Sequence, residues 1–185
     1  MQQVAKDLQL PIPPVEHISA SCGMMLKEII CRLFPMAECE VFLKKFQQLC
    51  LESNNRDYLF DDASKTLQQL QQNNYLMAIA TNKMRKELLF SLNHLEVHDY
   101  FCAIRCGDDE FVKPQAQVLH GILDELSIKP QHAVMIGDTK YDMLAAQNAN
   151  VDAIAIYCEP NQKQELLQYQ PIACIKSLSE LLNHL

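Results

Sequence analysis

The stretch Ile136-Gly137-Asp138-Thr139-Lys140-Tyr141-Asp142 decides how this sequence is interpreted. An apolar run over 133–136 predicts a buried strand, and the apolar residues 143–146 are typical of a helix. Asp138 and Asp142 therefore stand where a strand passes into a helix, the edge at which parallel sheets bind ligands. Such a carboxylate pair suits Mg²⁺, which prefers oxygen ligands. The alternative is structural, with Asp138 capping a turn and Asp142 capping the helix.

Composition limits the classes of protein to consider. The chain has 185 residues, 49% hydrophobic and 21% charged, which is typical of one packed domain with or without a small accessory lobe. A net charge of −7 disfavours nucleic-acid partners and anionic membrane surfaces. No apolar run approaches the ~20 residues of a membrane span. The N-terminus also lacks the apolar core of a signal peptide. The 8 scattered cysteines are expected as free thiols. We therefore expect a cytoplasmic protein with no nucleic-acid or membrane partner, and the oligomeric state stays open.

The first part of the chain, residues 1–57, is predicted to be a small helical lobe. Apolar residues recur at helical spacing over 26–33 and again over 41–50, and no segment alternates as a strand would. Residues 53–57 then form a polar break. We predict a helical domain over 1–57 that ends at this break.

From residue 58 onward the pattern changes to alternating strands and helices. Short apolar runs predict strands over 76–80, 101–106, 133–136 and 153–157. Helices are predicted over 63–72, up to residue 92, around 118–126 and over 142–148, and the capping-box pattern of residues 177–180 predicts a last helix. This order implies an α/β domain over 58–185 with a Rossmann-like parallel sheet.

Polar residues follow the strand runs in a fixed order. Thr81 and Asn82 follow the first run, and a hydroxyl with backbone N–H groups at a helix start is a natural phosphate site. Lys113 precedes the next helix, and Asp138 and Asp142 follow the third run. Taken singly, Thr81-Asn82 is more often a helix cap and Lys113 a solvated charge. As a set, at the carboxyl ends of parallel strands, they predict one site for a phosphate and a divalent cation.

These motifs resemble the haloacid dehalogenase-like hydrolases, and within them the phosphoglycolate phosphatases. The resemblance rests on residues 80–83, on 106–109 with 112–114, and on 136–142, and it covers most of the chain. It implies a haloacid dehalogenase-like α/β core whose helical cap is the lobe at 1–57. It also implies Mg²⁺-dependent hydrolysis of a small phosphorylated metabolite.

The resemblance also implies a role for each residue. Thr81 and Asn82 would bind the substrate phosphate, Thr81 through its hydroxyl. Lys113 would offset the charge of nucleophile and phosphate, so that Thr81 and Lys113 are the expected catalytic residues. Asp138 would ligate Mg²⁺, and Asp142 would support the metal directly or through water.

One motif of the family has no counterpart in this sequence. The family begins with a strand ending in Asp-x-Asp, whose first carboxylate is the nucleophile and whose second is a general acid/base. Asp7 stands in a polar helix with no apolar run before it, so this first central strand is missing. Three hypotheses follow: a phosphatase that is active once the strand is restored, a catalytically inactive relic or binding module, or a purely structural α/β domain. Whether the chain is itself an enzyme stays open, and Mg²⁺ binding is expected to be weak.

The missing strand has a physical consequence for the sheet. Burying ~4 apolar side chains contributes roughly 6–12 kcal/mol, comparable with the whole stability of a domain. We therefore expect the strands over 76–80 and 133–136 to pair directly, or another segment or chain to lie between them. We also expect the Lys113 ammonium to form an ion pair with Asp138 or Asp142.

Overall fold

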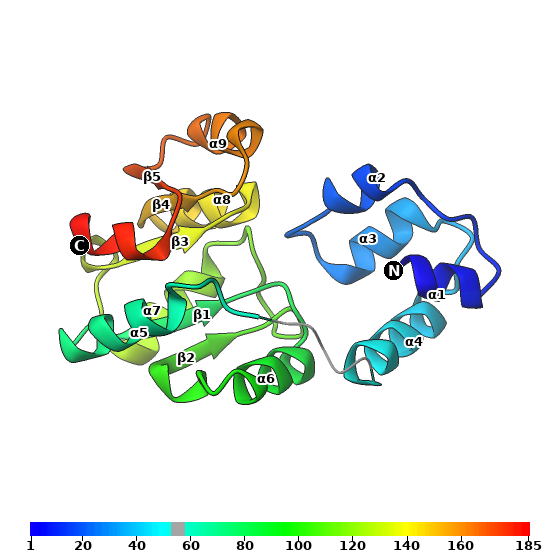
Figure 1. The fold of residues 1–185 in the computed structure, drawn as a ribbon, viewed down its shortest axis with the longest axis horizontal. Coiled ribbons are helices and arrows are strands. Elements are labelled where there is room, and N and C mark those ends of the chain that lie inside the picture. Colours follow the sequence, from blue (N-terminus) through cyan, green and yellow to red (C-terminus); the bar gives the residue numbers. More distant parts are fainter. Residues whose placement is uncertain (53–57) are drawn as a thin grey trace.

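The N-terminal part of the molecule is a helical segment with an apolar core of its own. The computed structural model describes residues 1–52 and 58–185. Within residues 1–52, the helical segment, lie α1 (Gln2–Asp7), α2 (Val15–Ser19), α3 (Leu26–Leu33) and α4 (Cys39–Glu52). The rings of Phe34 and Phe42 lie 4.6 Å apart at the centre of its apolar cluster. Figure 1 shows this segment beside the strands. The polar break predicted at 53–57 lies outside the described residues.

The second part of the molecule is a parallel α/β structure. The four predicted strands are present as β1 (Met77–Ala80), β2 (Phe101–Arg105), β3 (Val134–Gly137) and β4 (Asp152–Ile156). A short fifth strand, β5 (Ala173–Ile175), pairs with β4. We did not predict β5, because a three-residue strand carries too little periodicity to be recognised. All described strand pairs are parallel, as the alternation of strands and helices implied.

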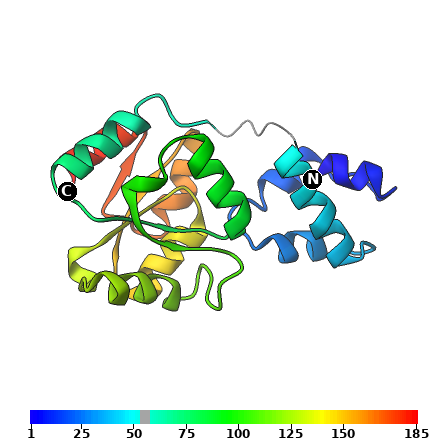
Figure 2. The same cartoon turned by 90° about the horizontal axis from the view of Figure 1, so that it is seen from below.

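Helices cover both faces of the strands. They are α5 (Ala63–Gln72), α6 (Arg85–His94), α7 (Gln117–Leu126), α8 (Lys140–Ala149) and α9 (Pro160–Leu167), with 3-10 turns η1 (His98–Tyr100), η2 (Pro130–His132) and η3 (Leu178–Asn183). Figure 2 shows α5 and η3 over one face and α7 and α8 over the other. Ser177 forms the predicted capping box, but the element that it opens is the 3-10 helix η3. The polar helix α9 was also not predicted. Within the described chain, no helix combines the length and apolar character needed to cross a membrane.

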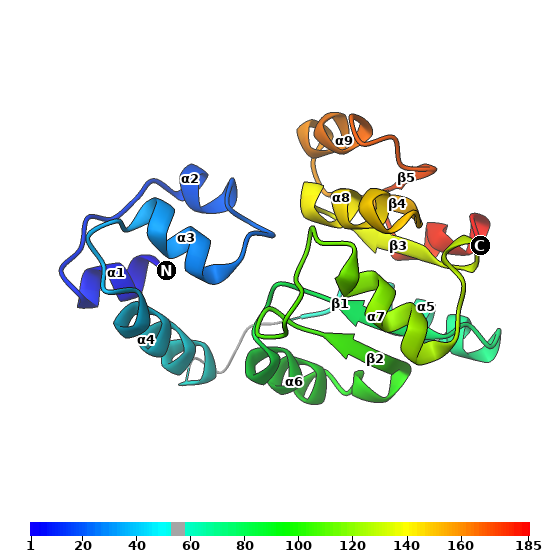
Figure 3. The same ribbon diagram turned by 180° about the vertical axis from the view of Figure 1, so that it is seen from behind.

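The strands form two sheets. One sheet pairs β1 with β2, and the other has the order β3-β4-β5. In Figures 1 and 3, β1 lies between β2 and β3, yet no strand hydrogen bonds join β1 to β3 in the described chain. The expectation that these two strands pair directly is therefore wrong. The alternative, that a further segment lies between them, stays a prediction.

Shared helical layers connect the two sheets. Leu70 of α5 belongs to one apolar cluster with Ile154 of β4, and Met77 of β1 and Ile136 of β3 pack against that same cluster. On the other face, α7 and α8 pack together over β4, with Ala80 of β1 at the margin. Side chains from both sheets thus pack under the same helices, although no strand hydrogen bonds join β1 to β3 in the described chain.

Candidate functional site

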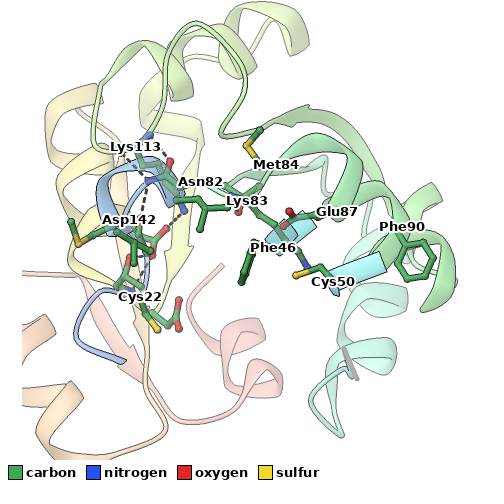
Figure 4. A pocket seen from close by; sticks show the side chains of 17 residues that line it. Cys22, Phe46, Cys50, Asn82, Lys83, Met84, Glu87, Phe90, Lys113 and Asp142 are labelled. Carbon is green, nitrogen blue, oxygen red and sulfur yellow. Dashed lines mark hydrogen bonds and ion pairs between the residues drawn. The ribbon is translucent and has the colours of Figure 1, made fainter. Parts of the chain in front are cut away.

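A cavity of about 550 Å³ lies between the helical segment and the carboxyl ends of β1 and β3. Thr81 and Asn82 reach it from the end of β1, Lys113 from the loop before α7, and Asp138 and Asp142 from the end of β3 and the start of α8. Figure 4 shows Lys113, Asn82 and Asp142 at one end of this cavity. All five residues expected at a phosphate and metal site therefore border one space.

Asp142 is fixed by the start of α8. Its Oδ2 accepts hydrogen bonds from the Thr139 amide at 3.0 Å and from the Thr139 hydroxyl at 2.6 Å, so that the two residues form a capping box. The alternative of a helix-capping role for Asp142 is thus partly realised, with Thr139 as the N-cap residue. The Thr-x-x-Asp pattern of 139–142 is the sequence signal that could have revealed it.

The second oxygen of Asp142 binds Lys113. The Lys113 Nζ lies 2.5 Å from Asp142 Oδ1, and only 9% and 5% of the two side chains are exposed. The expected ion pair is therefore present, and Lys113 is not a solvated charge. Burial makes the pair interdependent, because removing one partner leaves the other charge desolvated and uncompensated.

Asp138 differs from Asp142 in its surroundings. The residue is exposed at the cavity, and its backbone carbonyl accepts a hydrogen bond from the Gln162 side chain at 2.8 Å. Desolvation of its carboxyl group, and secondly the nearby Asp142 carboxylate, raise its pKa above the ordinary value. A cation beside the Asp138 carboxylate would offset this penalty on its charge.

The donor set fits a loosely held Mg²⁺. Mg²⁺ needs only one or two protein carboxylates when waters and substrate phosphate complete its shell. Asp138 offers its carboxylate to the cavity, while both oxygens of Asp142 are engaged by Lys113 and Thr139. Within residues 1–52 and 58–185 there is no cluster of three or more His, Cys, Asp or Glu that could hold a metal. Weak Mg²⁺ binding by this chain stays a prediction.

Thr81 and Asn82 play different parts. The Thr81 hydroxyl accepts a hydrogen bond from the Lys83 amide at 3.1 Å, which leaves its hydrogen for donation into the cavity. The buried Asn82 amide donates to the carbonyls of Gly23 at 2.8 Å and Lys113 at 3.0 Å and accepts from the Lys113 amide at 3.1 Å. The Asn82 side chain is thus committed to linking three segments of backbone, and it holds Lys113 in place.

The turn after β2 supports the start of α6. Asp108 accepts a hydrogen bond from the Arg85 amide at 2.9 Å, and the Arg85 guanidinium pairs with Asp109 at 2.6 Å. Gly107 lies so close to the Asn82 carbonyl that a Cβ there would overlap it. These acidic residues belong to the quoted 106–109 motif, and their contacts are structural, because they anchor the end of β2 to the helix that follows Thr81.

One loop of the helical segment enters the site. Gly23 has φ +83°, and a Cβ there would overlap Thr139 and Tyr141, so that a side chain at this position is excluded both by conformation and by space. Its carbonyl accepts the hydrogen bond from Asn82 described above. The sequence analysis did not identify Gly23 or the other cavity residues of the helical segment. The one sequence signal for Gly23 is the scarcity of glycine, with 4 in the chain.

Comparison with known proteins agrees with this geometry. The family model described as haloacid dehalogenase-like hydrolase matches residues 1–156. A phosphoglycolate phosphatase from Colwellia psychrerythraea is 34% identical over 144 residues, which are 77% of this chain and 62% of that protein. The pyrophosphatase PpaX from Bacillus cereus is 29% identical over 124 residues, 66% of this chain and 57% of that protein. The chain thus spans about three fifths of the length of these curated relatives.

The fold comparison gives the same answer over nearly the whole chain. A haloacid dehalogenase-like family hydrolase from Streptococcus pneumoniae superposes with a TM-score of 0.84 at 25% identity, covering 98% of this chain and 86% of that one. The match includes the helical segment as well as the α/β part. On the family match, the shared fold and the ordered set of site residues, this chain belongs to the haloacid dehalogenase-like hydrolase family.

Proposed function

We propose that this chain forms the phosphate- and metal-binding part of a phosphomonoesterase of the phosphoglycolate phosphatase type. The observation that carries the proposal is the convergence of Thr81, Lys113, Asp138 and Asp142 on one cavity. The phosphoglycolate phosphatase among the relatives supports phosphomonoester hydrolysis, and the pyrophosphatase supports phosphoryl hydrolysis in general. The substrate would be a small phosphorylated metabolite in the cytoplasm, and residues 1–57 would act as the cap over the core at 58–185.

Each residue has a chemical role in this proposal. The Thr81 hydroxyl donates a hydrogen bond to a phosphate oxygen beside the start of α6, where backbone N–H groups favour anions. The Lys113 ammonium neutralises part of the phosphate charge while Asn82 holds its backbone in place. Asp138, with Asp142 behind it, would hold Mg²⁺, which supplies electrostatic stabilisation of the phosphoryl oxygens when bound.

The nucleophile needs a separate source. Asp142 is committed to Lys113 and Thr139, and the polar ends of β1 and β3 flank the place where a carboxylate would face the phosphate. We propose that a further strand between β1 and β3, ending in Asp-x-Asp, supplies the nucleophile and the general acid/base. The reaction would proceed through an aspartyl-phosphate that water then hydrolyses.

Turnover of p-nitrophenyl phosphate and phosphoglycolate with Mg²⁺ tests this proposal. The 185-residue chain should show no measurable turnover, because a residual acceleration of ~10³–10⁴ is invisible against a reaction that enzymes accelerate by up to ~10²¹. A form extended by the Asp-x-Asp strand should be active on p-nitrophenyl phosphate, and Lys113→Ala or Asp138→Ala should abolish that activity. Robust turnover by the 185-residue chain would contradict the need for an added nucleophile.

A further inference from the structure

The cavity has two chemically different walls. The wall at the ends of β1 and β3 is polar and carries the phosphate-binding residues. The opposite wall comes from the helical segment and includes Met24 and Leu26, Ile29 of α3 and Phe46 of α4. Figure 4 shows Phe46 and Cys50 facing the cavity from α4. Among the described residues of this wall, none carries a charge.

The charged residues around the cavity oppose a second anionic group. Glu87, Asp138 and Asp142 bring carboxylates to the lining, whereas Lys83 and Lys113 bring the ammonium groups of the described residues. Lys113 is paired with Asp142, and the Lys83 Nζ lies 2.8 Å from the Ser91 hydroxyl. A ligand carboxylate placed against the apolar wall would lose its water without meeting a cation on that wall, which is unfavourable.

The size of the cavity suits a small-molecule ligand. A volume of about 550 Å³ falls within the ~300–1,000 Å³ of small-molecule sites, where apolar walls bind the body of a ligand and a few polar groups orient it. Phe90, at 39% exposure, and Met84 continue the apolar lining on the core side. The lining therefore suits a ligand with one anionic end and one apolar end.

We infer that the alcohol half of the substrate is apolar and uncharged, an aryl or branched aliphatic group in contact with Ile29 and Phe46, rather than a carboxylate-bearing group such as glycolate. This inference rests on the proposed function, since it assumes that Thr81 and Lys113 receive the phosphate. It adds the chemical class of the leaving group, which the apolar wall selects.

Non-hydrolysable phosphonates measure this selection without turnover. Three probes share the phosphonate and differ beyond it: methylphosphonate, benzylphosphonate and 3-phosphonopropionate, the last two being close in shape to phenyl phosphate and phosphoglycolate. Their dissociation constants for the 185-residue chain can be obtained from NMR shift titrations with Mg²⁺. Benzylphosphonate should bind at least ~10-fold more tightly than 3-phosphonopropionate, because ring burial on the apolar wall adds affinity.

Two variants assign the effect to the wall. Phe46→Ala should weaken the binding of benzylphosphonate and leave the dissociation constant of methylphosphonate unchanged. Ile29→Lys should tighten the binding of 3-phosphonopropionate by roughly 5- to 10-fold, because it places an ammonium group near the ligand carboxylate. Ile12→Lys is the matched control, since Ile12 is 54% exposed on the same helical segment and does not line the cavity.

The possible results separate this inference from the proposed function. If 3-phosphonopropionate binds as tightly as benzylphosphonate, or if Phe46→Ala weakens all three probes equally, the apolar leaving group is wrong although the phosphate site stands. If methylphosphonate fails to bind, or binds equally well to Lys113→Ala, the phosphate site itself is wrong and the inference falls with it.

Discussion

Strand β4 and the facing strands β1 and β3 have similar apolar sequences but different environments. Residues 153–156 of β4 are buried, with β3 and β5 on either side and helices over both faces. Every residue of β1, and residues 134–136 of β3, are only half-buried, and each strand has a single strand partner in the described chain. A continuous apolar run indicates coverage on two faces, but it does not indicate how many neighbouring strands are present.

The same strands also differ in how close they lie to the predicted site residues. The predicted site residues follow β1 and β3 or lie in the loop before α7, and the end of β4 contributes none of them. Packing against α5, α7 and α8 secures β4, while the polar groups gather at the two half-paired strands. The predicted site residues therefore gather near β1 and β3, the strands with one strand partner each in the described chain, and not near β4. The following experiments test this difference between the strands.

The largest expected effect comes from adding a strand between β1 and β3. An extended form that carries an apolar strand ending in Asp-x-Asp should unfold at higher urea, with a gain of roughly 6–12 kcal/mol from ~4 buried apolar side chains. Urea unfolding of both forms measures it. A version with the same strand made polar by Ser substitutions is the control. Equal stability of all three forms would show that β1 and β3 do not receive another strand.

The buried pair at the end of β3 should give the next effect. Lys113→Ala should lower the free energy of unfolding by about 3–5 kcal/mol, because the Asp142 carboxylate stays buried without its partner. Lys113→Met with Asp142→Leu should recover part of the loss, since no lone charge remains. Thermal unfolding of the single and double variants measures these changes in stability. A loss below ~1 kcal/mol for Lys113→Ala would show that the pair stabilises the fold no more than an exposed salt bridge does.

Two adjacent isoleucines compare the strands directly. Ile154 of β4 and Ile136 of β3 are register partners and belong to or border the same apolar cluster, but Ile154 is 0% exposed whereas Ile136 is half-buried. Ile154→Ala should cost about 2–5 kcal/mol and Ile136→Ala roughly half as much. Chemical denaturation of both variants measures the difference. Equal costs would mean that β3 is as fully packed as β4.

The smallest effect concerns the charge of Asp138. Its pKa is raised in the folded protein, so between the ordinary value of 3.8 and the raised value the folded state holds a proton that the unfolded state has released. Stability therefore falls as pH rises through this window, and the cost persists above it. Asp138→Asn should raise the melting temperature at pH 7 by roughly 1–2 °C, with the difference vanishing toward pH 3.8. If the difference in melting temperature grows on acidification, the pKa of Asp138 is lowered in the folded protein and not raised.

Much of the fold was predictable because its signals are local. The helix at 63–72 and the four main strands follow from periodicity and apolar runs in the sequence. The strand β5 and helix α9 were not predicted, because β5 is short and α9 is polar, and both take their places from contact with β4. Local sequence carries too little information where neighbours determine the structure.

By itself, the sequence determined the order of Thr81, Lys113, Asp138 and Asp142 after the apolar strand runs, and with it the family. Only the tertiary structure decided their partners: that Asp142 binds both Lys113 and Thr139, and that Asn82 is a link between backbones. It also decided that an apolar wall from the helical segment faces these groups and that β1 and β3 do not pair with each other in the described chain. The physical reason is that strand ends are set by short-range patterns, whereas distant segments meet through packing of shared helical layers.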